Sequence, residues 1–136
     1  MINIGLEPKQ RMVWEVNVIT GIGVDLIEVN RVVLACQKEH FKLRYFTQQE
    51  IDIINTDPKK AADNFAVKEA VAKMLGTGFR DFFPKDIEVL RNELGKPYVN
   101  LYGKAKEIAN LQKVANIHVS ITNTKDYANA FVVGEA

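Results

Sequence analysis

One predicted helix carries an acidic and a basic side chain on a shared face. Four residues recur at spacings of four, four and three: Phe65, Glu69, Lys73 and Gly76. These spacings place all four on one side of an α-helix. The apolar residues lie mainly on another side and form the expected core stripe: Val67, Val71, Met74 and Leu75. Two interpretations of the polar face are open. It is either an ordinary Glu–Lys surface pair, worth about 0.2–0.5 kcal/mol, or a pair that acts on a phosphorylated substrate.

A further acidic side chain ends an apolar run with two glycines, Gly21-Ile22-Gly23-Val24-Asp25. A dinucleotide-binding loop would need a third glycine where this chain has Leu26, so that interpretation fails. Glycines in a strand allow another backbone or a ligand to approach closely. Asp25 then has two possible roles, as a cap for the following helix or as a ligand-binding carboxylate.

The two acids together are compatible with phosphoryl-transfer chemistry. A Mg²⁺ ion that serves a diphosphate usually takes one or two protein carboxylates, and water and substrate oxygens complete its shell. Asp25 and Glu69 would be enough, and Lys73, one helical turn beyond Glu69, could reach a phosphate oxygen. A metal and a lysine would offset the charge that builds up on a diphosphate. The spacing permits this site without requiring it.

The first strand of the predicted terminal hairpin, over 116–122, contains polar side chains in alternation. His118, Ser120 and Thr122 fall on one face, and the intervening residues are apolar. A polar strand face is commonly the solvated side of an antiparallel sheet, and ligand binding is the other open interpretation. A serine hydrolase is disfavoured because the chain has no G-x-S-x-G nucleophile turn.

Composition describes an ordinary folding domain. The chain has 136 residues, of which 47% are hydrophobic and 26% charged, with a formal net charge of +1. We expect one domain over 1–136, with 1–18 as an N-terminal extension. The charge balance gives no general attraction to nucleic acid or to an anionic membrane, and no apolar run is long enough for a membrane span. The single cysteine, Cys36, fits a reducing compartment, so we expect a cytoplasmic protein.

The order of the predicted elements favours an α+β fold, with an antiparallel sheet packed against helices, one of them long. Thr47 and Glu50 form a capping-box pattern, and Gly76 is a typical residue to end the long helix. Strands are expected over 12–24, 86–91, 98–101, 116–122 and 128–133. Helices are expected from about Asp25, from Thr47 to about Asn55, from Asp57 to Leu75 and near 104–111.

Four segments taken together resemble a known family. They are GIGVDLIEVNRV, FAVKEAVAKMLGTG, LGKPY and HVSITNTKDYANAFVV, in the order and spacing of the holo-acyl-carrier-protein synthase family of 4′-phosphopantetheinyl transferases. The resemblance covers about residues 20–134. It implies Mg²⁺-dependent transfer of phosphopantetheine from coenzyme A to a serine of an acyl carrier protein, with release of adenosine 3′,5′-bisphosphate. It also implies a role in fatty acid biosynthesis and a homotrimer with active sites at the subunit interfaces.

The resemblance assigns roles to individual residues. Asp25 and Glu69 match the metal-binding acids and, with Lys73 at the diphosphate, form the implied catalytic set. Coenzyme binding is implied for eight positions: Asn64, Phe65, Lys73, Gly76, Ser120, Thr122, Asn123 and Thr124. Arg31 matches a basic residue that meets the acidic carrier protein, and Lys38, His40 and Arg44 extend that patch.

Two positions depart from the family pattern. Asn64 stands where an arginine is usual, and Asn123 stands where a second histidine is usual. Both family positions lie near the 3′-phosphate and adenosine end of the coenzyme, so losing both cations should weaken binding there. Two alternatives therefore accompany the transferase interpretation. One is a weakened or inactive homologue that binds a carrier protein, and the other is a transferase that prefers a donor without the 3′-phosphate.

Overall fold

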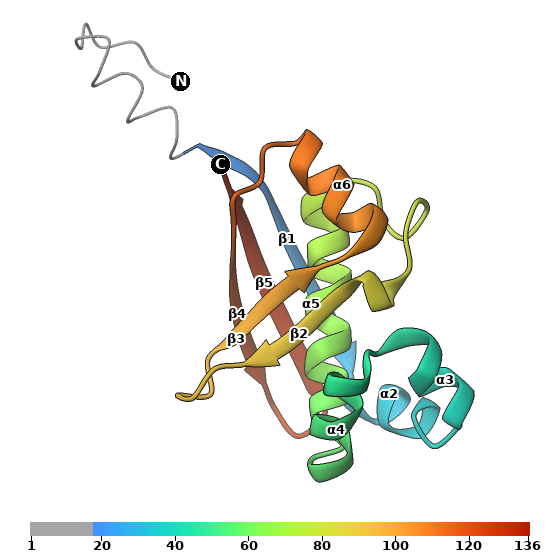
Figure 1. Ribbon diagram of the computed structural model, residues 1–136. Coiled ribbons are helices and arrows are strands. Elements are labelled where there is room, and N and C mark those ends of the chain that lie inside the picture. The colour runs from blue at the N-terminus through green and yellow to red at the C-terminus, as the bar shows by residue number, and fades with distance from the viewer. Residues whose placement is uncertain (1–17) are drawn as a thin grey trace, which may run out of the picture.

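The computed structural model describes residues 18–136 and shows an α+β arrangement (Figure 1). Its elements in chain order are β1 (Ile19–Glu28), α2 (Val29–Ala35), α3 (Glu39–Tyr45), α4 (Gln48–Thr56), α5 (Lys60–Leu75), a 3₁₀ turn η1 (Pro84–Asp86), β2 (Ile87–Arg91), β3 (Pro97–Leu101), α6 (Gly103–Leu111), β4 (Asn116–Asn123) and β5 (Tyr127–Glu135). Within this part of the chain, no helix has both the length and the apolar composition needed to cross a bilayer.

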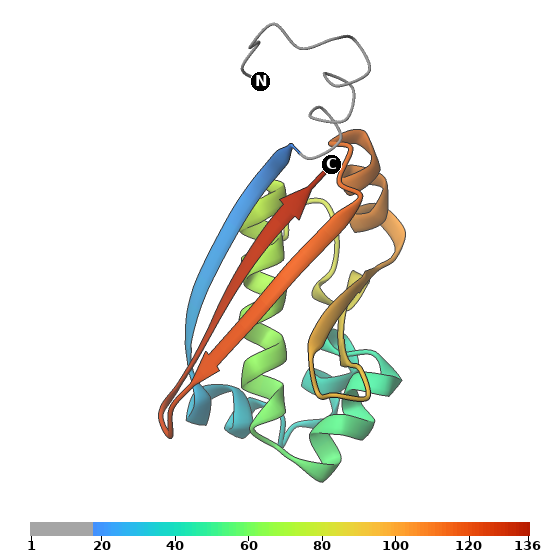
Figure 2. The same cartoon turned by 90° about the vertical axis from the view of Figure 1, so that its left-hand side faces the viewer.

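The strands form two antiparallel sheets on opposite sides of α5. One sheet has the order β1-β5-β4, and the other is the β2–β3 hairpin. Figure 2 shows the three-stranded sheet in front of α5, and Figure 1 shows the hairpin crossing it from the other side. Helix α5 contacts β1 and β5 on one side and β2 on the other. The antiparallel α+β fold expected from the sequence is therefore confirmed.

The sequence pattern of α5 accounts for its placement between the two sheets. Val67 and Val71 are fully buried, whereas Glu69 is half-buried and Lys73 is exposed, as the helical spacing predicts. The helix ends at Gly76, whose φ of 77° is in the left-handed region that glycine adopts without a steric penalty. The predicted helix end is confirmed.

Two glycines let β1 lie directly on α5. A Cβ atom on Gly23 would stand 1.8 Å from the carbonyl oxygen of Ala70, and one on Gly21 would stand 2.4 Å from that of Met74. Any side chain at these positions would push the strand away from the helix. The close contact brings the next inward-facing residue of β1, Asp25, beside the polar face of α5.

Several predicted boundaries need correction. The strand expected over 12–24 is wrong at its C-terminal end, because pairing with β5 continues from Ile19 to Glu28; residues 12–17 lie outside the described part. The helix expected near Asp25 begins at Val29 instead. Asp25 pairs with Ala130 in the middle of the ladder, so its proposed role as a helix cap is wrong.

The start of the long helix also differs from the expectation. Asp57 Oδ1 accepts a hydrogen bond from the Lys59 backbone N–H at 3.3 Å, in a turn that precedes the first helical residue, Lys60. The capping box at Thr47 is confirmed, since its hydroxyl accepts from Glu50 N–H and the Glu50 carboxylate accepts from Thr47 N–H. Helix α3 was not predicted from the sequence.

Candidate functional site

The structure brings Asp25 and Lys73 into direct contact, although 48 residues separate them. Lys73 Nζ donates to Asp25 Oδ1 at 2.9 Å and to the Val24 carbonyl oxygen at 3.0 Å. The side chain of Asp25 is 16% exposed and that of Lys73 is 55% exposed. A long, largely solvated lysine can leave this partner for a ligand at low energetic cost, because exposed ion pairs contribute about 1 kcal/mol or less.

Glu69 shares the electrostatic environment of this pair. Burial raises the pKa of the Glu69 carboxyl, the charge of Asp25 raises it further, and Lys73 opposes both effects. Two carboxylates that repel one another favour a bound cation, which removes the repulsion. The two acids and the lysine predicted from sequence therefore occupy one site.

The donor set fits a hard divalent cation. Residues 18–136 contain no cluster of three or more histidine, cysteine or acidic side chains that could enclose a metal. Two half-buried carboxylates match the number and type of protein ligands that Mg²⁺ takes when substrate oxygens and water supply the rest. Asp25 and Glu69 could hold such an ion only together with an oxygen-rich ligand.

A cavity of about 380 Å³ opens beside Glu69. Its lining includes the basic side chains of Arg44 and Arg80 and the rings of Phe65 and Phe79. An acid that can bind a cation, two guanidinium groups and two aromatic rings suit a ligand with both phosphate and apolar parts. The family resemblance implied that Phe65 binds the coenzyme and that Arg44 binds the partner. Arg80 was not among the predicted site residues, because nothing in the sequence around it distinguishes it from other surface arginines.

A second cavity, also of about 380 Å³, has the predicted partner-binding residue Arg31 in its lining. Its apolar lining includes Leu26, Val32 and Phe41, and Phe65 borders this cavity as well as the one beside Glu69. Arg31 is exposed, as are Lys38, His40 and Arg44 on the following segment. An exposed cation at the rim of an apolar groove suits an amphipathic acidic partner.

The terminal hairpin contributes to a third cavity, of about 390 Å³, which Ser120 and Asn123 line. The Asn123 side-chain amide donates to both oxygens of Asp63, at 3.0 and 3.2 Å. Thr122 is exposed on the outer side of the sheet. Thr124 Oγ1 accepts from the Tyr127 backbone N–H at 3.1 Å and so closes the β4–β5 turn. Of these residues predicted to bind the coenzyme, only Ser120 and Asn123 border the cavity.

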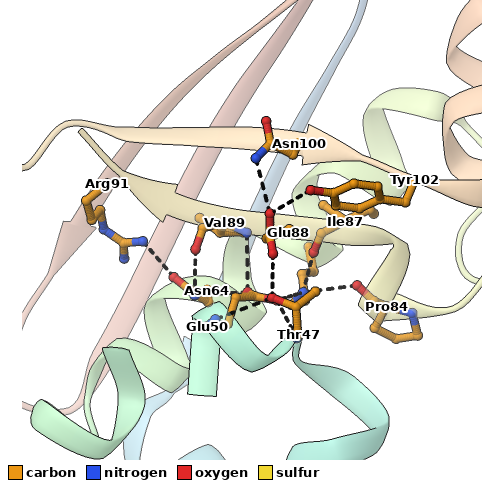
Figure 3. A network of polar contacts seen from close by, with 11 residues as sticks. Thr47, Glu50, Asn64, Pro84, Ile87, Glu88, Val89, Arg91, Asn100 and Tyr102 are labelled. Atoms are coloured by element: carbon orange, nitrogen blue, oxygen red, sulfur yellow. Dashed lines mark hydrogen bonds and ion pairs between the residues drawn. The ribbon is translucent and has the colours of Figure 1, made fainter. Parts of the chain in front are cut away.

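Asn64 lies inside the protein, in the polar network that Figure 3 shows. Its amide nitrogen donates to Glu50 Oε2 and to the Val89 carbonyl oxygen, both at 3.0 Å, and its Oδ1 accepts from Arg91 at 2.9 Å. The side chain is fully buried and its hydrogen-bonding groups are occupied. Its amide is therefore committed to holding neighbouring residues in position.

The same network contains a buried ion pair between α4 and α5. Lys68 Nζ donates to Glu50 Oε1 at 2.8 Å, to the Pro84 carbonyl oxygen at 3.0 Å and to the Ile87 carbonyl oxygen. Burial raises the pKa of Glu50 and lowers that of Lys68, and their mutual attraction opposes both shifts. The pair fixes α4 and the start of β2 against α5. Its lysine, Lys68, directly precedes Glu69 in the helix.

Glu88 extends the network toward the β2–β3 hairpin. Its carboxylate accepts from the Thr47 hydroxyl at 2.6 Å, from Asn100 at 3.1 Å and from the Tyr102 hydroxyl at 3.0 Å. Burial alone would raise the pKa of Glu88, but these hydrogen bonds outweigh it and lower the pKa. The network thus joins β2 to the start of α4, to β3 and to the residue that precedes α6.

Comparisons with known proteins identify the family of this chain. A family model described as the 4′-phosphopantetheinyl transferase superfamily matches residues 21–132. The chain belongs to this superfamily. A protein named Holo-[acyl-carrier-protein] synthase from Lachnoclostridium phytofermentans is 58% identical over 117 residues, which cover 86% of this chain and 96% of that protein. The family prediction is confirmed, and with it the prediction that the chain is an enzyme, a transferase.

Solved structures of the family show the same fold. A holo-[acyl-carrier-protein] synthase from Neisseria meningitidis is 31% identical, with a TM-score of 0.78 over 88% of this chain and 100% of its own. A holo-(acyl-carrier-protein) synthase from Bacillus anthracis, in complex with CoA (3′,5′-ADP), is also 31% identical. Its TM-score is 0.71, and the match covers 87% of this chain and 97% of that one.

The buried ion pair yields a prediction about stability and pH. Lys68→Met leaves the Glu50 carboxylate buried without its partner, which should lower the free energy of unfolding by about 3 kcal/mol at neutral pH. Without Lys68, the folded-state pKa of Glu50 rises further above its unfolded value, so the folded protein takes up the proton first as the pH falls. The destabilisation should therefore shrink between about pH 8 and about pH 5.5.

Urea unfolding at both pH values, at one protein concentration, measures this change. Lys106→Met, on the exposed face of α6, serves as the control and should change stability by less than about 0.5 kcal/mol. The variant Lys68→Met should lose less unfolding free energy at the lower pH. A loss that stays constant or grows as the pH falls would show that Lys68 does not compensate a buried Glu50 charge.

Proposed function

We propose that this protein transfers 4′-phosphopantetheine from coenzyme A to a serine of an apo acyl carrier protein. The observation that carries the proposal is the meeting of Asp25, Glu69 and Lys73 between β1 and α5, in a chain of this family. The products are holo carrier protein and adenosine 3′,5′-bisphosphate. The names of the relatives support the carrier protein as acceptor, and the coenzyme A complex of the Bacillus anthracis structure supports the donor.

Asp25, Glu69 and Lys73 have different roles in the proposed transfer. Asp25 and Glu69 would hold Mg²⁺, which when bound offsets negative charge on the diphosphate. Lys73, released from Asp25, donates to a phosphate oxygen and offsets the charge that builds up during transfer. The serine oxygen forms a new bond to the phosphorus that carries the pantetheine, and the bond from that phosphorus to the nucleotide oxygen breaks. A carboxylate or a polarised water accepts the serine proton.

The carrier protein docks, in this proposal, over the groove beside Arg31. The guanidinium of Arg31 stands at the edge of an apolar cavity, and Lys38 and Arg44 add positive charge on the neighbouring segment. An acidic amphipathic helix would complement this surface, because opposite charge guides approach and the groove accepts apolar side chains. Phe65, which borders both this groove and the cavity beside Glu69, connects the docking surface to the site of transfer.

The active assembly is, we propose, a homotrimer. The outer face of the three-stranded sheet exposes large apolar side chains that α5 does not cover, with Ile22 at 60%, Val24 at 51% and Leu26 at 62%. Phe131, 44% exposed, is paired with Val24 across the β1–β5 ladder, so the side chains form a continuous patch. A contiguous apolar face of this kind is typical of a protein–protein interface. Copies of the chain packed through it would form active sites where subunits meet.

We also propose a domain organisation, a pathway and a cellular compartment for this enzyme. The chain would act as a single transferase domain in fatty acid biosynthesis in the cytoplasm. The family match over residues 21–132 supports the single domain. The lone cysteine, Cys36, supports a reducing compartment, since the chain can form no internal disulfide.

Glu69→Gln tests the transfer directly. The substitution keeps the size of the side chain but removes the charge that would bind the metal, so kcat/KM should fall by at least about a hundredfold. The measurement incubates the protein with apo carrier protein, coenzyme A and Mg²⁺ and follows the mass of the carrier. Glu107→Gln makes the same chemical change on exposed α6 and should keep full activity. Turnover of Glu69→Gln within about threefold of the parent chain would defeat the assignment.

Phe131→Asp tests the assembly. A charge in the apolar patch would be desolvated in the trimer, so the variant should sediment as a smaller species and lose transferase activity. Leu111→Asp is the matched control, because Leu111 is 83% exposed at the end of α6, outside the sheet. Sedimentation velocity distinguishes the two variants. If Phe131→Asp sediments like the parent chain, the patch is not the interface.

A further inference from the structure

The peptide groups on both sides of Asp25 accept hydrogen bonds from side chains of other elements. Lys73 Nζ, from α5, donates to the carbonyl oxygen of Val24 at 3.0 Å as well as to the Asp25 carboxylate. The side-chain Nδ2 of Asn129, from β5, donates to the carbonyl oxygen of Asp25 at 3.0 Å, across 104 residues of sequence. Two successive carbonyl groups, one before and one after the Cα of Asp25, are therefore held by side chains.

Holding both peptide groups fixes the direction of the side chain between them. The two peptide planes that flank a Cα set its φ and ψ, and these angles determine where the Cα–Cβ bond points. A carboxylate that binds a metal must be held within about 0.5 Å of its productive position. Pairing of β1 with β5 places Asp25 opposite Ala130, and the two side-chain bonds add to this support.

The two bonds differ in what happens to them during the proposed transfer. Lys73 is 55% exposed, and in the proposed function it leaves Asp25 to donate to a phosphate oxygen. That movement also removes its bond to the Val24 carbonyl, because both bonds come from one nitrogen. Asn129 is partly buried, and its short side chain is carried by a paired strand. Its bond does not depend on the lysine, so it persists after the lysine has moved.

Asn129 lies on the face of the sheet opposite to the Asp25 side chain. It pairs with Leu26 in β1 and with Thr122 in β4, and the side chains of such pairs point to the same side. Leu26 is 62% exposed on the outer face, whereas the Asp25 side chain points inward to Lys73 of α5. The backbone of the sheet thus separates the Asn129 amide from a ligand at the carboxylates of the same chain. Asn129 acts on that site through the strand that carries Asp25.

An amide at position 129 needs a partner because its neighbours toward β1 are apolar. Leu26 lies opposite Asn129, and Phe131 follows it on the same face. Covering an amide with apolar groups costs free energy unless its polar atoms form hydrogen bonds. The bond to the Asp25 carbonyl satisfies one donor of the amide, and a leucine of similar size could not make it.

We propose that Asn129 is a positioning residue that holds Asp25 in place for metal binding after Lys73 has turned to the substrate. The inference rests on the proposed function. Without the amide, the chain should need more Mg²⁺ to reach the same rate, while the rate at saturating Mg²⁺ stays close to that of the parent chain. A contact needed only for folding would instead lower the stability, or lower the rate at every Mg²⁺ concentration.

The first test compares the Mg²⁺ requirement of Asn129→Leu and Asn129→Gln. In Asn129→Leu, the Mg²⁺ concentration that gives half the maximal rate should rise roughly tenfold, the lower end of the effect of residues that support a metal ligand. Its kcat at saturating Mg²⁺ should stay within about twofold of the parent chain. Asn129→Gln keeps the donor on a longer stem and should give a smaller rise. Asn116→Leu makes the same change at the exposed start of β4 and should behave like the parent chain.

Backbone ¹⁵N relaxation gives a second test that needs neither turnover nor metal. The amide nitrogen of Leu26 belongs to the same peptide plane as the Asp25 carbonyl, so its order parameter reports how firmly that plane is held. Lys73→Met reproduces the departure of the lysine. In this background, Asn129→Leu should lower the order parameter from about 0.85 toward about 0.6, the values of rigid and flexible backbone, and Asn116→Leu should leave it unchanged.

The two tests separate failure of this inference from failure of the proposed function. If the parent chain transfers no phosphopantetheine, the proposed function fails, yet a lower order parameter in the Asn129→Leu background variant would still support the positioning of Asp25. An unchanged order parameter would overturn the inference even if transfer is observed. A parental Mg²⁺ requirement in Asn129→Leu would also overturn it. So would a loss of activity that accompanies sedimentation as a smaller species, since Asn129 would then act in the subunit interface.

Discussion

The direct packing of β1 on α5 is the contact on which the rest of the site depends. Gly21 and Gly23 leave no room for a side chain between the strand and the carbonyl oxygens of the helix. Because the strand lies this close, Asp25 reaches the polar face of α5, where Lys73 donates to it and Glu69 feels its charge. Two half-buried acids and one exposed lysine are enough protein groups to bind a diphosphate together with a metal ion. The chemistry therefore follows from a backbone contact that only glycine permits.

A second scaffold acts on the opposite side of α5. The Glu50–Lys68 pair, Asn64 and Glu88 satisfy one another inside the protein and hold α4 and β2 against the helix. A buried ion pair is weak evidence of stability, because desolvation offsets much of the attraction. In this protein the pair instead fixes how α4 and β2 are placed against α5. Asn64, placed by Glu50, presents Arg91 to the cavity at the terminal hairpin, so one buried network has a consequence at the surface.

The sequence predicts well what depends on local spacing. Glu69 and Lys73 on one helix face, the capping box at Thr47 and the helix end at Gly76 are all set within a few residues, and the structure agrees. Asp25 was associated with Glu69 through chemistry and a family resemblance, and its contact with Lys73 depends on packing that no local pattern reveals. The burial of Asn64 and the cavity position of Arg91 depend on residues 14 and 27 positions away, so no local pattern reveals them. The true end of β1 was missed because pairing with β5 overrides the helical spacing that begins at Leu26.

Asp25 and Glu69 share one electrostatic site between β1 and α5. The most direct measurement is the pKa of the Glu69 carboxyl by ¹³C NMR titration, in the parent chain and in Asp25→Asn. Removing the charge of Asp25 also frees Lys73, and both changes stabilise the Glu69 anion, so the pKa of Glu69 should be lower in the variant. A pKa that is unchanged or higher in Asp25→Asn would show that the two acids do not meet, and would contradict the account.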